Sequence, residues 1–144
     1  MSKQASLVAE GGCLCGAIRY RIKGEPIARS LCHCRSCRKA SAAPSVAWVT
    51  VALADYEIVA GKPSAHRSSP PVARTFCGRC GSPLTYHHDD DVDTIDVTTV
   101  TLDDPERFAP TYELWLQDKL AWETLNEHLD HYPRTRREGK AGAG

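Results

Sequence analysis

Long apolar runs are missing from this sequence. No stretch approaches the roughly 20 apolar residues that a membrane-spanning helix needs, and residues 1–12 lack the apolar core of a signal peptide. The formal net charge is zero at pH 7, so no excess of positive charge draws the chain to nucleic acid or to an anionic membrane. These absences predict a cytoplasmic protein that binds neither membrane nor nucleic acid.

The sequence also lacks the even number of cysteines that is typical of a disulfide-bonded protein. The chain has 7 cysteines in 144 residues, and an odd number cannot pair completely into internal disulfides. A chain that is not exported also meets a reducing thiol pool, which keeps cysteines free. Their close spacing favours metal binding over seven separate apolar thiols. They form three groups: Cys13 and Cys15; Cys32, Cys34 and Cys37; Cys77 and Cys80.

The length and patterning predict one mainly β domain. A chain of 144 residues suits a single core, and alternation and turn residues predict short antiparallel strands. The expected strands cover residues 17–23, 45–53, 72–76, 84–87, 94–102 and 111–116. Short helical turns are expected within residues 32–42 and at residues 105–108.

We expect a single metal-binding domain to cover residues 1–132 and a disordered basic tail to cover residues 133–144. Three large apolar side chains are expected to anchor the core or to line a pocket: Trp48, Trp115 and Trp122.

The spacing within each cysteine group suits zinc. Four thiolates around a zinc ion form bonds of about 2.3 Å and lie about 3.8 Å apart. A turn such as Cys77-x-x-Cys80 brings two sulfurs this close, and Cys13-x-Cys15 on an extended loop places two sulfurs on the same side. Spacing alone leaves open which groups share an ion. A closed site with four ligands and an open site with three would use all seven cysteines.

Three segments resemble the signatures of the glutathione-dependent formaldehyde-activating enzyme family. They are Gly-Cys-Leu-Cys-Gly-Ala at residues 12–17, Cys-His-Cys-Arg-Ser-Cys-Arg-Lys at residues 32–39 and Phe-Cys-Gly-Arg-Cys-Gly-Ser at residues 76–82. Residues 103–105 and 115–122 are similar to the C-terminal part of the family, so the resemblance covers nearly the whole chain. It implies a compact β-tent of small antiparallel sheets around a structural zinc, with one or two short helical turns.

The resemblance also implies two zinc ions per chain and assigns their ligands. The first and last signatures share the structural zinc, which carries over to Cys13, Cys15, Cys77 and Cys80. The middle signature holds a second, catalytic and labile zinc, which carries over to Cys32, Cys34 and Cys37.

The activity that the resemblance implies is that of a carbon–sulfur lyase, which adds glutathione to formaldehyde or to another small aldehyde. An open three-cysteine site suits this chemistry, because a thiol that binds zinc loses its proton at neutral pH. Arg35, Arg38 and Lys39 surround the middle cysteines in the sequence. They are candidates for binding the carboxylates of glutathione, or they only offset the charge of the thiolates.

The main alternative is a non-catalytic zinc-binding module for a thiol, a protein or a nucleic acid. The neutral charge disfavours nucleic acid, and an open three-cysteine site disfavours a purely structural role, since structural zinc sites are closed. A redox switch at Cys77 and Cys80, or a rubredoxin-like iron centre, would leave the other cysteine groups unexplained.

Two positions depart from the family pattern. Ala42 stands where glycine is frequent, and Glu113 stands near a position where histidine is frequent. Neither is a ligand position, so the metal interpretation is unaffected. His33 lies between two predicted ligands, and we expect its side chain to point away from the metal.

Overall fold

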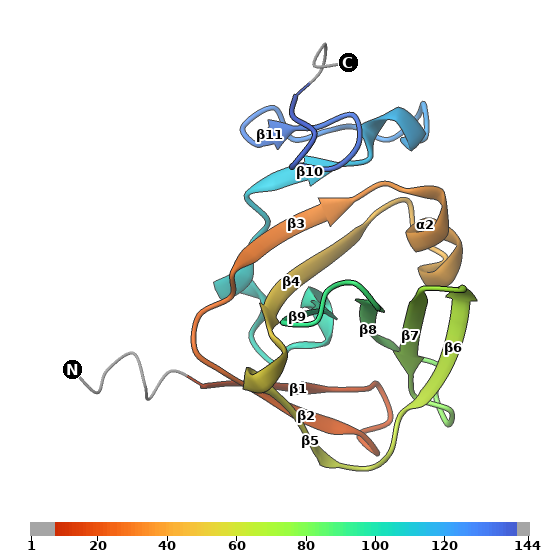
Figure 1. Ribbon diagram of the computed structural model, residues 1–144, viewed down its shortest axis with the longest axis vertical. Helices are drawn as coiled ribbons and strands as arrows, with labels where there is room; N and C mark the ends of the chain where they lie inside the picture. The colour runs from red at the N-terminus through yellow and green to blue at the C-terminus, as the bar shows by residue number, and fades with distance from the viewer. Residues whose placement is uncertain (1–7, 141–144) are drawn as a thin grey trace, which may run out of the picture. The chain divides into compact units, whose positions relative to one another are not determined.

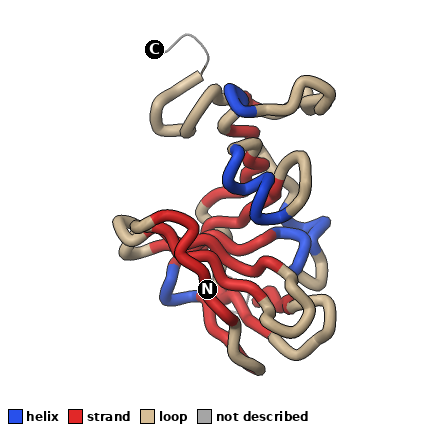
Figure 2. The backbone as a smooth tube through the Cα atoms, turned by 90° about the vertical axis from the view of Figure 1, so that its right-hand side faces the viewer, coloured by secondary structure: helices blue, strands red, loops and turns tan. Residues whose placement is uncertain are grey.

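The computed structural model describes residues 8–140. Within this range the chain divides into two compact units, which we call unit 1 (residues 8–28 and 49–108) and unit 2 (residues 29–48 and 109–140). Strands are the main regular structure of the described residues, which confirms the mainly β prediction (Figures 1 and 2). None of the helices described between residues 8 and 140 is long and apolar enough to cross a membrane.

Unit 1 contains two sets of antiparallel strands (Figure 1). The first set is a three-stranded sheet in the order β1 (Val8–Gly12), β2 (Arg19–Lys23), β5 (Tyr56–Ala60). The second set comprises β6 (Ser64–Ser69), β7 (Val72–Phe76), β8 (Pro83–His88) and β9 (Thr94–Thr98). Beyond β9 lies the part of β4 (Val46–Ala52) that belongs to unit 1. Three short 3-10 helices complete the unit: η1 (Leu53–Asp55), η2 (Thr99–Thr101) and η3 (Pro105–Phe108).

The core of unit 1 follows from strand alternation. In β2, Tyr20 and Ile22 are buried, whereas Arg19 and Arg21 on the other face are partly exposed. These apolar side chains join a buried cluster that includes Val49, Val51, Leu84, Val97, Leu102 and Phe108. The strands expected around residues 17–23, 45–53, 72–76 and 84–87 and the helix at residues 105–108 are therefore present.

One strand of unit 1 is shorter than the sequence predicts. Residues 94–102 were expected to form a single strand, but β9 ends at Thr98 and η2 follows. The hydroxyl of Thr101 donates to the Thr98 carbonyl at 2.9 Å. This local side-chain hydrogen bond competes with strand pairing and favours the turn.

Unit 2 is built around β10 (Tyr112–Leu114), which lies between β3 (Ala28–Cys32) and β11 (Asp130–His131). Helix α2 (Arg35–Ser41) follows β3 and leads into β4, and η4 (Leu116–Asp118) follows β10. Both partners of β10 run parallel to it, unlike the antiparallel strands that the sequence predicts and that unit 1 contains. The long chain segment between β3 and β10 allows the parallel pairing, which a short hairpin could not provide.

The tryptophans differ in burial. Trp48 is 6% exposed and packs as an anchor should, but Trp122 is 71% exposed, so the expectation that it belongs to a core or pocket wall is wrong. Trp115 is half-buried and its φ of 58° lies outside the β region, so β10 ends at Leu114, before the end of the strand expected over residues 111–116.

Residues 133–140 contact β10 and the residues after it. The carbonyls of Pro133 and Arg134 accept hydrogen bonds from Gln117 and Trp115 at 3.0 Å, and the guanidinium of Arg136 lies 4.6 Å from the ring centre of Tyr112. The domain boundary at residue 132 stays a prediction, and residues 141–144 of the expected tail lie outside the described residues.

A partly buried carboxyl in β9 makes the stability of unit 1 depend on pH. Desolvation is the main effect on Asp96 and raises its pKa from 3.8 to about 6. The Thr50 hydroxyl donates to the carboxylate at 2.6 Å and lowers the pKa. The charge of Asp91 raises the pKa further, and His87 lowers it. The folded state therefore holds this proton more tightly than the unfolded chain. The resulting stabilisation is complete below about pH 4 and is lost as the pH rises through about 6.

We expect Asp96→Asn to stabilise the protein at pH 8, because a neutral amide replaces a partly buried negative charge. Each pKa unit corresponds to about 1.4 kcal/mol, so the gain should be about 1–3 kcal/mol at pH 8 and close to zero at pH 4. Urea unfolding of both proteins at the two pH values measures the difference. Asp93→Asn, an exposed change in the loop before β9, should show no such dependence. A stability difference that is the same at both pH values would contradict the assignment.

Candidate metal centres

Four cysteines of unit 1 come together from two strand connections. Cys13 and Cys15 lie between β1 and β2, and Cys77 and Cys80 lie between β7 and β8. Their Sγ atoms all lie within 4.8 Å of one another, with 3.6 Å between Cys13 and Cys15 and 3.8 Å between Cys15 and Cys77. Ligand sulfurs of tetrahedral zinc lie about 3.8 Å apart, so this group fits a zinc ion with four ligands.

A tight turn closed by a glycine N–H presents each cysteine pair, over three residues at Cys13 and over four at Cys77. The N–H of Gly16 donates to the Cys13 carbonyl at 3.1 Å, and the N–H of Gly81 donates to the Cys77 carbonyl at 2.8 Å. Both glycines have positive φ, 81° and 85°, which a residue without Cβ adopts at little cost. The Arg79 N–H also points to the Cys77 sulfur at 3.3 Å, and such donors favour the thiolate form.

The ionisation of these sulfurs explains why the group suits a cation. Hydrogen bonds with Ser82 lower the pKa of Cys80 to about 5, so this sulfur is negative at neutral pH. At Cys15 the Ala17 N–H lowers the pKa, but desolvation and the neighbouring sulfurs together raise it to about 11. Further negative charge in the cluster is therefore costly unless a cation binds there.

The other three cysteines form a second cluster in unit 2, where β3 ends and α2 begins. Cys32 is the last residue of β3, Cys34 is the N-cap of α2, and Cys37 lies in its first turn. Their Sγ atoms lie within 4.8 Å of one another; Cys34 is partly exposed, and the other two are buried. The sulfurs of Cys34 and Cys37, together with burial, raise the pKa of Cys32. This cluster therefore also suits a cation, with one ligand fewer.

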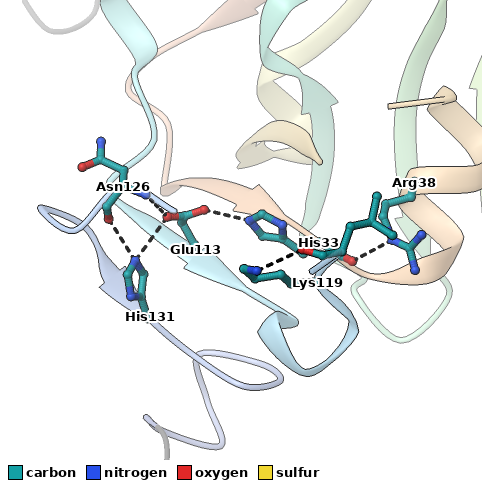
Figure 3. Close-up of polar contacts among 7 residues, drawn as sticks. His33, Arg38, Glu113, Lys119, Asn126 and His131 are labelled. Atoms are coloured by element: carbon teal, nitrogen blue, oxygen red, sulfur yellow. Dashed lines mark hydrogen bonds and ion pairs between the residues drawn. The ribbon is translucent and has the colours of Figure 1, made fainter. Parts of the chain in front are cut away.

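The cations expected to bind a substrate all lie on α2. Arg35 and Lys39 are exposed, and Arg38 is partly buried. Nε of Arg38 donates to the carbonyl of His33 at 3.3 Å (Figure 3). Arg38 therefore supports the loop that carries the cysteines, whereas the other two cations face solvent.

His33, between Cys32 and Cys34, is completely buried. Its Nε2 lies 2.7 Å from Oε1 of Glu113. The imidazole is not part of the donor group that the three sulfurs form, which agrees with the expectation that it points away from a metal.

The carboxylate of Glu113 is also buried and has partners at both oxygens (Figure 3). Besides the contact of Oε1 with His33, Oε2 accepts the N–H of Asn126 at 2.9 Å and lies 3.2 Å from Nε2 of His131. Nε2 of His131 also lies 2.9 Å from the carbonyl oxygen of Asn126. Three segments of unit 2 thus meet at one side chain.

Sequence reasoning identifies neither Glu113 nor its partners Asn126 and His131 as parts of the site. The sequence does contain one signal, a carboxylate between Tyr112 and Leu114 in an expected strand. A carboxylate that is buried there requires polar partners, so its position indicates that such partners lie nearby. Asn126 and His131 carry no comparable signal, since polar residues outside an apolar stretch are usually solvated.

Comparison with known proteins gives a family match over most of the chain. Residues 8–118 match the family described as glutathione-dependent formaldehyde-activating enzyme. A Halomonas elongata protein named "putative glutathione-dependent formaldehyde-activating enzyme" is 33% identical over 88 residues, which cover 54% of this chain and 55% of the relative. The match thus spans about half the length of that relative.

A solved structure shares the fold. The crystal structure of a Rhodobacter sphaeroides protein superposes with a TM-score of 0.56 at 21% identity and covers 65% of this chain and 87% of that chain. At this identity the similarity concerns the fold alone.

Proposed function

Because the chain belongs to the glutathione-dependent formaldehyde-activating enzyme family, we propose that it is a zinc-dependent carbon–sulfur lyase. It would join a glutathione-type thiol to formaldehyde or to another small aldehyde. The observation that carries the proposal is the pair of unequal clusters, four sulfurs in unit 1 and three in unit 2. A structural zinc site is closed by four ligands, whereas a catalytic site has three protein ligands and an open position.

The two clusters then have different roles. Cys13, Cys15, Cys77 and Cys80 would hold a structural zinc, and Cys32, Cys34 and Cys37 would hold the catalytic one. Bound zinc would supply an open position at which an incoming thiol loses its proton at neutral pH. The partly exposed Cys34 marks the side of the cluster that solvent and substrate can reach.

The reaction itself needs only a thiolate and an aldehyde held close together. The sulfur adds to the carbonyl carbon and forms the carbon–sulfur bond, while the electron pair of the C=O bond moves to oxygen. That oxygen takes a proton from water and becomes the hydroxyl of the product. Holding the two reactants together supplies most of the acceleration that such an addition requires.

The cations of α2 would bind the carboxylates of glutathione. Arg38 is the strongest candidate, because its Nε contact with the His33 carbonyl fixes the guanidinium beside the cysteine loop. Arg35 and Lys39, both exposed, would add positive charge around the entrance. Three thiolates on one divalent ion leave a net negative charge, which these cations would also offset.

We expect Arg38→Ala to weaken the binding of glutathione about tenfold, because a hydrogen bond to a charged group contributes about 1.5–3 kcal/mol. A glutathione ester without free carboxylates should lose much less affinity. Calorimetric titration of both ligands measures the difference, with Arg79→Ala, an exposed arginine of unit 1, as the control. Equal losses for the two ligands would show that Arg38 only supports the loop.

A further inference from the structure

The buried carboxylate of Glu113 has no part in the reaction described above, yet it contacts His33, which lies between two cysteines of the second cluster. Strand β10 pairs in parallel with β3, so Leu114 lies opposite Cys32 and Glu113 lies opposite Leu31. This register brings the Glu113 side chain to His33, the residue that separates two of the three cysteines. The contact therefore joins a strand to the cysteine loop.

His33 is held in place at three points. Its N–H donates to the Leu114 carbonyl at 3.0 Å, its carbonyl accepts from Arg38 at 3.3 Å, and its Nε2 meets Glu113 at 2.7 Å. The Nδ1 atom is buried and has no hydrogen-bond partner between residues 8 and 140. Within the described chain, the orientation of the imidazole thus depends on Glu113 (Figure 3).

The C-terminal segment holds Glu113 from the other side. The Asn126 N–H can only donate, and Nε2 of His131 lies between two oxygen acceptors, so it carries its hydrogen there. Oε2 therefore has two donors, and Oε1 is left for His33. Both donors lie beyond residue 118, where the family match ends.

We propose that Glu113 is a positioning residue for the second zinc. It orients His33 and thereby the cysteine loop, and Asn126 and His131 hold its carboxylate in place. The inference rests on the second zinc of the proposed function but not on the lyase activity. Outer partners that fix a metal site typically change its affinity about 10–100-fold when they are replaced. Loss of Glu113 should thus loosen the second zinc and leave the four-cysteine zinc unaffected.

The test is the rate at which zinc leaves the protein in the presence of a chromophoric chelator. Wild type should release zinc in a fast phase from the three-cysteine cluster and a slow phase from the four-cysteine cluster. In Glu113→Gln the amide keeps the size of the side chain but has only one acceptor oxygen. Its NH₂ group must therefore face either His33 or the two donors at Asn126 and His131. We expect the fast phase to accelerate about tenfold and the slow phase to stay unchanged.

A double-mutant cycle tests whether Glu113 acts through His33. In a His33→Ala background, Glu113→Gln should cause no further acceleration, whereas independent effects would multiply. The ¹⁵N signals of the His33 ring should show a hydrogen on Nε2 in wild type and a changed pattern in Glu113→Gln. His131→Asn, at a half-exposed position, provides a milder loss of support should Glu113→Gln fail to fold. His128→Ala, an exposed change in the same segment, is the matched control.

Each outcome bears on one of the two proposals. An unchanged fast phase in Glu113→Gln and His131→Asn would overturn the positioning role while leaving the two-zinc model intact. Multiplicative effects in the His33 background would overturn the route through His33. A wild type that holds a single zinc would overturn the second site, and this inference with it. A selective acceleration that disappears in the His33→Ala background would establish the role.

Discussion

Replacing Cys80 with serine is expected to leave unit 1 unable to fold. The four-cysteine cluster joins the β1–β2 connection to the β7–β8 connection, and Cys15 and Cys77 meet across 62 residues of chain. A structural zinc contributes about 10–16 kcal/mol, which is comparable to or greater than the roughly 5–15 kcal/mol by which domains are stable. Circular dichroism and thermal melting of Cys80→Ser should show loss of the cooperative transition.

The control for this prediction is Arg79→Ala. Arg79 is exposed and lies beside the ligand in the same turn, but only its backbone contacts a sulfur. This variant should melt like wild type. A normal melting curve for Cys80→Ser would mean that the four sulfurs do not hold the structural ion.

Replacing Cys34 with serine should have the opposite profile, with a folded protein and no catalysis. Cys34 caps α2 by accepting the Cys37 N–H at 3.2 Å. Serine is also a favoured N-cap, so we expect the stability to change by less than about 1 kcal/mol. The loss should instead be one ligand of the second zinc, and the zinc content should fall from about two ions per chain to about one.

Exchange spectroscopy on a mixture of formaldehyde and glutathione measures the catalytic loss. Wild type should accelerate the interconversion of adduct and free reactants, and Cys34→Ser should return it to the rate without protein. Equal rates for the two proteins would remove the lyase proposal and leave a zinc protein that binds thiols. Tighter binding of another thiol would keep the chemistry and replace the substrate.

The sequence predicts those parts of the fold in which local pattern and structure agree. Tyr20 and Ile22 alternate with arginines because one face of β2 is buried. β6 gives no such signal, since all of its residues are exposed and its position depends on pairing with β7. The parallel pairing of β10 with β3 could not be predicted either, because it depends on where a distant part of the chain returns.

The clusters show the same limit. Short spacing identifies the cysteine pairs and triplets, and the structure brings the predicted members of each cluster together. Glu113 contacts His33, Asn126 and His131, which lie 80, 13 and 18 positions away from it along the chain. No local sequence pattern indicates contacts over such separations. Ala42 follows α2 with a φ of 52°. Glycine adopts this conformation more readily than alanine, which accounts for the glycine that the family pattern favours at this position.

The distances along the chain also suggest an order of assembly during synthesis. Each cysteine pair of unit 1 is local, but closing the 62-residue loop between Cys15 and Cys77 restricts the chain by about 4 kcal/mol of entropy. Zinc bound first to one pair would capture the other as soon as Cys80 has been made. All seven thiols are in the chain before Glu113 is added. The second cluster would therefore pass through a stage with its ligands present but its loop unsupported, when competing thiols could most easily remove its ion.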